Sequence, residues 1–153
     1  MRENKSDMEF LYTYAQLKAV QDRIAEIEKE TDAITERRQQ GASWDDERER
    51  YNALWDERDW LEEREEAMRR AVRPEIGMPC TVCHWSDRSK AKVEKILDKS
   101  GKTIQVKQCG VYTSSMVFSL RRNGAWVEKG SRYDTYANHL ILAYEEDYFD
   151  MSF

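Results

Sequence analysis

The fold is decided first by residues 10–34, FLYTYAQLKAVQDRIAEIEKETDAI, in which apolar or small residues recur at alternating intervals of three and four. These positions are Phe10, Thr13, Leu17, Val20, Ile24, Ile27, Thr31 and Ile34. The spacing is the a/d pattern of a coiled coil and predicts a helix over about residues 7–40. At 1.5 Å per residue this helix would be about 50 Å long.

A second helix is predicted over about residues 44–72. Gly41 stands where a left-handed residue usually ends a helix, and Ser43 followed by Asp46 is a variant of the capping box. The second seam reads Trp44, Glu47, Tyr51, Leu54, Arg58, Leu61, Glu65, Met68 and Val72, with three charged members. Because only a short link separates the helices, they are expected to run antiparallel as a hairpin.

The hairpin, residues 1–73, is predicted to mediate self-association or to bind a partner. Trp55 and Trp60 lie off the seam and widen the apolar face of the second helix. Two helices alone bury little surface, so such surplus aromatic residues favour a homo-oligomer.

Residues 74–153 are predicted to form a small antiparallel barrel. Pro74 ends the second helix, and the hairpin signals Ser100-Gly101 and Asn123-Gly124, the latter typical of a type I′ turn, separate short apolar runs. Strands are expected at 80–85, 91–97, 103–108, 112–120, 125–128 and 139–144, which suggests an SH3-like barrel and an α+β fold. The expected core comprises Val93, Ile96, Leu97, Ile104, Val106, Val117, Phe118, Leu120, Trp126, Leu140 and Leu142.

Charge divides the chain. The formal net charge is −5, but residues 1–73 hold 14 Lys or Arg against 20 Asp or Glu, a net of −6. Residues 74–144 hold 11 against 6, a net of +5, before an acidic tail begins at Glu145. The second half therefore suits an anionic ligand.

The chain is expected to act in the cytoplasm of a host cell. No apolar run is long enough to span a bilayer, the first residues are polar, and three cysteines are an odd number that favours reduced thiols.

Cys80-Thr-Val-Cys83-His84 matches the spacing of c-type haem attachment. Haem is disfavoured because the motif falls in a predicted strand, where the two cysteines would face opposite sides. Zinc, with Cys109 and His139 as further ligands, stays open, although core cysteines are favoured because a second Cys-x-x-Cys is missing.

No catalytic motif is present, so a non-enzymatic protein without cofactors is expected. The second half instead carries basic and aromatic residues that could hold phosphates and stack on bases. The members of this group are Trp85, Arg88, Lys90, Lys92, Lys102, Lys107, Tyr112, Arg121, Arg122, Trp126, Arg132 and Tyr133. The alternative, favoured by composition alone, is that the tryptophans are core and the cations only solvate the strands.

Four short motifs resemble a family of small phage-encoded β-barrel proteins. They are residues 77–88, GMPCTVCHWSDR; Val93 to Lys102, ending in Ser-Gly-Lys; 118–126, FSLRRNGAW; and the acidic 148–153, YFDMSF. This family includes the Thoeris anti-defence sponge proteins. The loop after Gln108 is shorter here, and residues 7–72 have no counterpart in the family pattern.

The resemblance implies a phage anti-defence protein that binds a cyclic nucleotide immune signal, such as a cyclic ADP-ribose isomer, without chemistry. Alternatives are an anti-CRISPR-type inhibitor that presents the acidic helices to a host effector nuclease, and a nucleic-acid-binding barrel.

The expected ligand-binding residues are Trp85, Arg88, Lys102, Tyr112, Arg121 and Trp126. Arg88, on a tight turn after Trp85, and Arg121 are expected to contact anionic groups, and Trp85 and Tyr112 to stack. Arg121 is preferred to Arg122 because strand alternation places it on the face opposite Phe118 and Leu120.

Overall fold

The computed structural model describes residues 9–110, 113–130 and 137–146, and these form two compact units. One unit is Ala15–Met68, and the other joins Met1–Tyr14 to Arg69–Phe153. Within the described residues, no helix is long and apolar enough to cross a membrane. The fold consists of two helices and a closed antiparallel barrel, which confirms the predicted α+β class.

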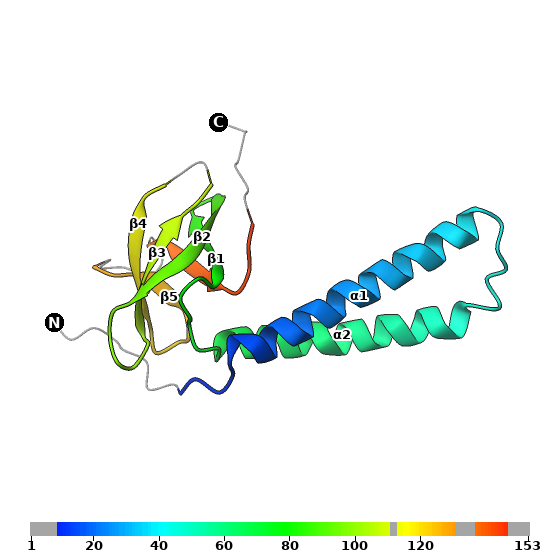
Figure 1. The fold of residues 1–153 in the computed structure, drawn as a ribbon, viewed down its shortest axis with the longest axis horizontal. Coiled ribbons are helices and arrows are strands. Elements are labelled where there is room, and N and C mark those ends of the chain that lie inside the picture. Colours follow the sequence, from blue (N-terminus) through cyan, green and yellow to red (C-terminus); the bar gives the residue numbers. More distant parts are fainter. Residues whose placement is uncertain (1–8, 111–112, 131–136, 147–153) are drawn as a thin grey trace. The chain divides into compact units, whose positions relative to one another are not determined.

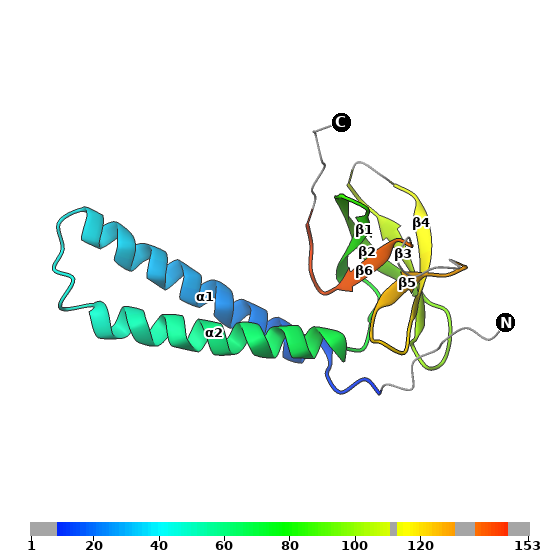
Figure 2. The same cartoon turned by 180° about the vertical axis from the view of Figure 1, so that it is seen from behind.

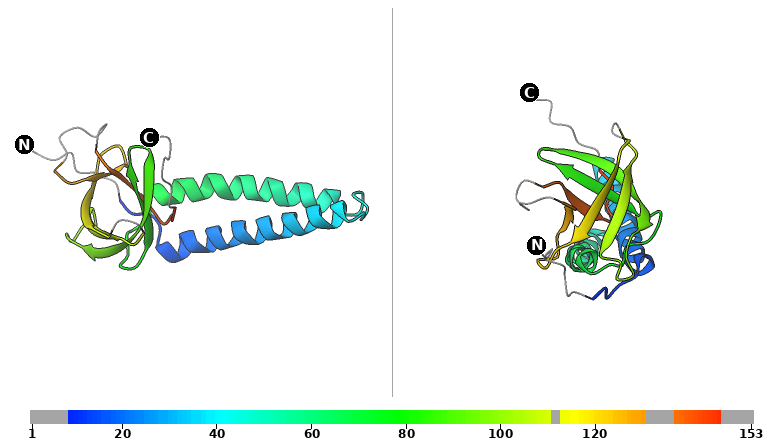
Figure 3. Two further views of the ribbon diagram at one scale, coloured as in Figure 1. Left: turned by 90° about the horizontal axis from the view of Figure 1, so that it is seen from above. Right: turned by 90° about the vertical axis from the view of Figure 1, so that its left-hand side faces the viewer.

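The first unit is a helical hairpin made from α1 (Tyr14–Gln39) and α2 (Arg48–Arg70). The helices run side by side in opposite directions (Figure 1; seen from above in Figure 3, left). The apolar cluster between them contains Ile24, Ile27 and Ile34 from α1 and Leu54 and Leu61 from α2. These residues belong to the two predicted seams, so burial of the seams explains why the helices pair.

Both helices begin later than predicted. Residues 9–13 are not helical, and Tyr12 forms a parallel bridge with Val72 while Arg73 N donates to Tyr12 O at 3.0 Å. The expected helix start at residue 7 is therefore wrong for residues 9–13. Gly41 has the expected left-handed φ of +97°, and Ala42 N donates to Arg37 O, which ends α1.

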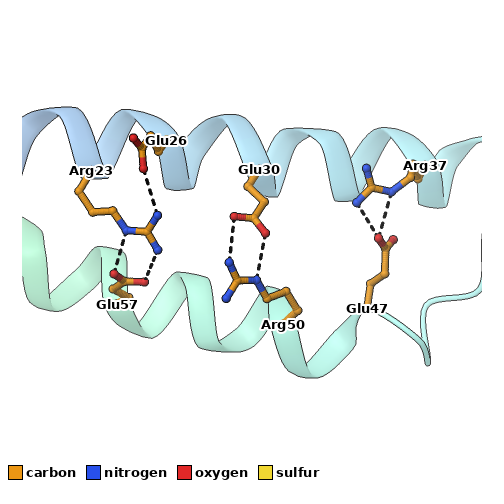
Figure 4. A network of polar contacts seen from close by, with 7 residues as sticks. All are labelled: Arg23, Glu26, Glu30, Arg37, Glu47, Arg50 and Glu57. Carbon is orange, nitrogen blue, oxygen red and sulfur yellow. Dashed lines mark hydrogen bonds and ion pairs between the residues drawn. The ribbon is translucent and has the colours of Figure 1, made fainter.

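Ion pairs join the two helices along one edge of the hairpin, as Figure 4 shows. The Arg23 guanidinium makes two 2.9 Å bonds to the Glu57 carboxylate. Arg50 binds Glu30 in the same bidentate manner, at 2.9 and 3.1 Å. We call these pairs, together with the Arg37–Glu47 pair at 2.6 Å, the interhelical ladder. The Arg23 guanidinium lowers the pKa of Glu57, in keeping with a charge-assisted bond.

Ion pairs also account for the charges at two positions of the second predicted seam, one just before α2 and one within it. Glu47 is paired with Arg37, and Arg58 binds Glu28 at 2.9 Å and Glu62 at 3.1 Å. The aliphatic stem of a seam arginine can cover the core while its head reaches an acid at the edge.

The second unit contains six antiparallel strands that close into a barrel in sequence order (Figures 1 and 2; Figure 3, right). They are β1 (Pro79–His84), β2 (Asp87–Ile96), β3 (Thr103–Gln108), β4 (Ser115–Leu120), β5 (Trp126–Glu128) and β6 (His139–Leu142). Pairing of β1 with β6, from Cys80↔Leu142 to Cys83↔His139, closes the barrel. Closure leaves neither of these strands as a free sheet edge.

Most of the predicted barrel core is buried. Val93, Ile104, Val106, Phe118, Leu120, Trp126, Leu140 and Leu142 are all buried. Ile96 and Leu97 are 39% and 47% exposed, so their assignment to the core is wrong. The register shifts between Val93 and Lys95, and this bulge interrupts the strand alternation just before Ile96.

The hairpin turns depart from the prediction in two places. Arg88 lies in β2 opposite Cys83, not on the turn, because β1 and β2 continue to the His84↔Asp87 pair and leave only Trp85 and Ser86 between them. At the other turn, Arg121 N donates to Ala125 O, and Gly124 has φ +86° while Asn123 has no positive φ. This is a three-residue loop with a left-handed glycine in place of the expected type I′ turn.

Candidate functional site

The predicted ligand-binding residues are divided between the two ends of the barrel. β2 is 10 residues long and therefore spans about 30 Å. Trp85 and Arg88 lie where β2 begins, and Lys102 follows the loop after its end. Leu120 N donates to Lys102 O, which places Arg121 at the Lys102 end. One small ligand cannot contact both ends, and Tyr112 lies outside the described residues.

At the first end, Trp85 is held in an unusual position. It is 91% exposed and has φ +43°, in the left-handed region that a bulky side chain rarely adopts. The two-residue turn between His84 and Asp87 imposes this conformation. Trp85 is therefore displayed to solvent, as its predicted role as a stacking face requires.

Arg88, near Trp85, is engaged by the segment that follows β6. Its Nη1 donates to Glu146 Oε2 at 2.9 Å, and Tyr144 Oη donates to the same oxygen at 2.9 Å. These two bonds, with the Tyr144 bond the larger cause, lower the pKa of Glu146. Thr81 Oγ1 donates to Tyr144 O and accepts from Glu146 N, which anchors the segment to β1. A ligand anion at Arg88 would have to compete with Glu146.

A buried polar cluster lies at the same end. The Gln108 amide nitrogen donates to Ser89 Oγ at 2.8 Å and lies 2.7 Å from His84 Nε2, and Ser114 Oγ donates to Gln108 Oε1. Gln108 and Ser89 are almost completely buried. These bonds satisfy side chains inside the barrel and join β1, β2 and β3 to the loop before β4.

The second end carries an open pocket of about 340 Å³. It is lined by Glu9, Phe10, Arg73, Ser100 and Lys102. The Arg73 guanidinium carbon lies 5.5 Å from the centre of the Phe10 ring, within the range of a cation–π contact. The pocket, which we call the Lys102 pocket, combines one aromatic ring, two cations and one carboxylate.

The loop that carries Ser100 and Lys102 is held by Asp98. Its Oδ1 accepts from Ser100 Oγ and from Lys102 N, both at 3.0 Å. Burial raises the pKa of Asp98, but these hydrogen bonds prevail and the pKa is lowered. Gly101 faces Phe10, since a Cβ there would lie 3.3 Å from Phe10 Cε2.

Arg121 and Trp126 are buried rather than exposed. Arg121 is 7% exposed and Arg122 is exposed, the reverse of the predicted orientation. Alternation fails here because Phe118, Ser119 and Leu120 are all buried, so both faces of β4 are covered at this end. Trp126 lies opposite Leu120 and Leu140 within the barrel core.

Sequence reasoning identified only Lys102 among the residues of the pocket. Phe10 fitted the heptad pattern of the first predicted helix, and Arg73 was noted only as the residue that follows the second predicted helix. The pocket forms because Leu11 N donates to Ala71 O and Arg73 N to Tyr12 O, which brings the two segments together. No local signal in the sequence indicates this pairing.

The three cysteines are free thiols that differ in burial. Cys80 is buried, Cys83 is half-buried and Cys109 is exposed, and burial raises the pKa of the Cys80 thiol to about 12. The described residues include all three cysteines and both histidines, and among them no three metal-ligating side chains of the His, Cys, Asp and Glu types are grouped around one point.

Comparison of the chain with protein-family models, with curated proteins and with solved structures finds no match.

Proposed function

We propose that this protein is a phage anti-defence protein that binds a cyclic nucleotide immune signal, such as a cyclic ADP-ribose isomer, and sequesters it unchanged. The observation that carries the proposal is the Lys102 pocket, where the Phe10 ring lies beside the cations Arg73 and Lys102. The resemblance of residues 77–88 and 118–126 to phage sponge proteins supports the same ligand class. We therefore propose the Lys102 end of the barrel as the ligand site, and not the end that carries Arg88.

The chemistry of the pocket suits a ligand with phosphates and a flat base. Arg73 and Lys102 can each donate charge-assisted hydrogen bonds to phosphate oxygens. The ring of Phe10 offers an apolar surface to a base or ribose. A volume of about 340 Å³ is at the lower end of the range for small-molecule sites.

The test is a calorimetric titration of cyclic ADP-ribose isomers and cyclic oligonucleotides into the wild-type protein and its Lys102→Ala and Arg73→Ala variants. Loss of one charged hydrogen bond to phosphate should cost about 1.5–3 kcal/mol, or roughly ten- to a hundredfold in affinity. Lys107→Ala is the matched control, because Lys107 is an exposed cation near the opposite end of β3. This control should change the affinity less than twofold.

Equal losses for Lys102→Ala and Lys107→Ala would reject the pocket as the site. Duplex DNA is the second titrant, since a nucleic-acid-binding barrel is the weaker of the two alternatives. Tight, steeply salt-dependent binding of DNA without binding of cyclic nucleotides would replace the proposal by that alternative.

We also propose that the barrel is SH3-like and that the hairpin is a coiled coil that joins copies of the chain. The short antiparallel strands in sequence order support the first. The heptad spacing of Leu54, Leu61 and Met68 supports coiled-coil pairing of α1 and α2 within the hairpin. The exposed side of α1 carries both signs of charge, for example Lys18, Asp22, Lys29 and Asp32. It can therefore oppose a second copy without repulsion.

A further inference from the structure

The side of α2 opposite its buried seam is strongly acidic. Leu54, Leu61 and Met68 are the buried residues of α2, and residues two, five and six positions along from each point away from them. Together with the turn before α2, these exposed positions are Asp45, Asp46, Glu49, Asn52, Ala53, Asp56, Asp59, Trp60, Glu63, Glu66 and Ala67. None of these is Lys or Arg; the next exposed position on the same side, two residues beyond Met68, is Arg70, where the acidic stretch ends. We call this surface the α2 outer face.

Three arginines of the hairpin pair with acids that lie outside this face. Arg50 binds Glu30 and Arg23 binds Glu57 in the interhelical ladder (Figure 4), and Arg58 binds Glu28. The ion pairs therefore fix the helix pairing and do not neutralise the α2 outer face. Ala15–Met68 keeps 9 Lys or Arg against 17 Asp or Glu, a net charge of −8. Such a one-sided charge attracts a cationic partner.

Trp60 lies in the middle of this face. It is 60% exposed, and the Arg64 guanidinium, at the edge of the face, is 5.9 Å from its ring. Solvent-exposed helix positions are mostly polar. Tryptophan, by contrast, is enriched among the residues that contribute most to binding in protein interfaces. An indole ring is also the best aromatic acceptor for a guanidinium or ammonium.

We propose that the α2 outer face docks an Arg- and Lys-rich segment of a partner protein. One cation of the segment lies on the Trp60 ring, and others pair with Asp56, Asp59 and Glu63. Charge complementarity selects this occupant: nucleic acid and anionic lipid would be repelled, and two copies of this face would repel each other. The surface belongs to the hairpin and is independent of the proposed nucleotide site in the barrel.

The probe is a synthetic peptide of about 15 residues in which Arg and Lys alternate with Leu, long enough to cover about four helical turns. It is titrated calorimetrically into the full chain at 150 mM NaCl, where the dissociation constant should be below about 20 μM. Asp56→Asn/Glu63→Gln and Trp60→Ala should each weaken binding about tenfold. The matched control is Asp32→Asn/Glu36→Gln, which removes the same charge from exposed positions of α1 and should weaken binding less than twofold.

Equal weakening by the two double variants would show that only diffuse charge attracts the peptide and would overturn the proposal. So would the absence of binding at 150 mM NaCl, or full binding by Trp60→Ala. The double variant at 56 and 63 should bind cyclic nucleotides as the wild type does, and Lys102→Ala should bind the peptide normally. Failure of one proposal is therefore separable from failure of the other.

Discussion

At Gly101 the backbone φ is +76°, and a Cβ built there would lie 3.3 Å from Cε2 of Phe10. Gly101→Ala therefore adds contact with Phe10 to the backbone strain of a left-handed alanine, which alone is about 1–2 kcal/mol. We expect urea denaturation to show a loss of about 2 kcal/mol or more in the free energy of unfolding.

The matched control is Gly130→Ala. Gly130 has a similar φ of +89°, but among the described residues, its chain neighbours apart, no atom lies within 4 Å of the corresponding Cβ. Gly130→Ala should lose only the free energy of unfolding that comes from backbone strain, about 1–2 kcal/mol. If the two variants lose the same free energy, Phe10 is not packed against Gly101 and the wall of the Lys102 pocket is misassigned.

Glu146 should make stability depend on pH. Its pKa is lowered in the folded protein by Tyr144 and Arg88, from an ordinary value of 4.5. A lowered carboxyl pKa gives stability that is complete above about pH 4.5 and is lost as the pH falls through the folded pKa. Glu146→Gln should therefore lower the melting temperature at pH 7 and have little effect near pH 2.5.

Glu145→Gln, one position away, is the control for this pH dependence and should behave as the wild type at both pH values. A melting-temperature difference between wild type and Glu146→Gln that persists undiminished at pH 2.5 would exclude the carboxylate as its source.

Single side chains also show where sequence reasoning reaches its limit. Strand parity correctly buries Phe118 and Leu120, but it fails for Arg121 because both faces of β4 are covered there. Trp126 is of a residue type that is common in binding sites, but it is buried in the barrel core. Burial on the second face of a strand depends on residues distant in sequence, so local patterns cannot determine it.

At the scale of elements, the interhelical ladder sets the register of the two helices. Glu30→Arg or Arg50→Glu alone would place like charges at contact distance, and each should destabilise the hairpin by up to about 1 kcal/mol. The Glu30→Arg/Arg50→Glu double variant restores the pair in reverse and should recover most of the loss in thermal unfolding.

Lys29→Glu is the control for the ladder, because Lys29 is an exposed cation of α1 and changes charge by the same amount as Arg50→Glu. When Lys29→Glu is combined with Glu30→Arg, the loss of stability should equal the sum of the losses in the two single variants. A double variant at 30 and 50 as unstable as the sum of its single variants would show that the pair does not couple the helices.

The helices and strands were predictable wherever a local pattern and a burial requirement agree. The heptad spacing found both helices, and the range of β3 matched its prediction of residues 103–108. Phe10 and Thr13 fit the heptad pattern too, yet residues 9–13 lie outside α1. Backbone bonds from Leu11 and Tyr12 to Ala71 prevail there, and a contact across 60 residues leaves no periodic signal.

For the whole molecule, self-association through the hairpin is the remaining architectural prediction. Multi-angle light scattering at about 10 μM should give a mass at least twice that of the 18.2 kDa chain. Lys18→Glu/Lys29→Glu would replace both lysines of α1 by acids and should shift the mass toward the monomer. A wild-type monomer at this concentration would contradict the prediction.

Sequestration of the ligand without chemistry can be measured by equilibrium titration followed by recovery of the ligand. Cyclic ADP-ribose isomers are titrated calorimetrically into the full chain, and the bound ligand is then released by denaturation and identified by mass spectrometry. We expect saturable binding with a dissociation constant below about 10 μM, roughly −7 kcal/mol, and recovery of intact ligand. Binding weaker than that by every isomer, or recovery of a cleaved product, would contradict the proposed sequestration.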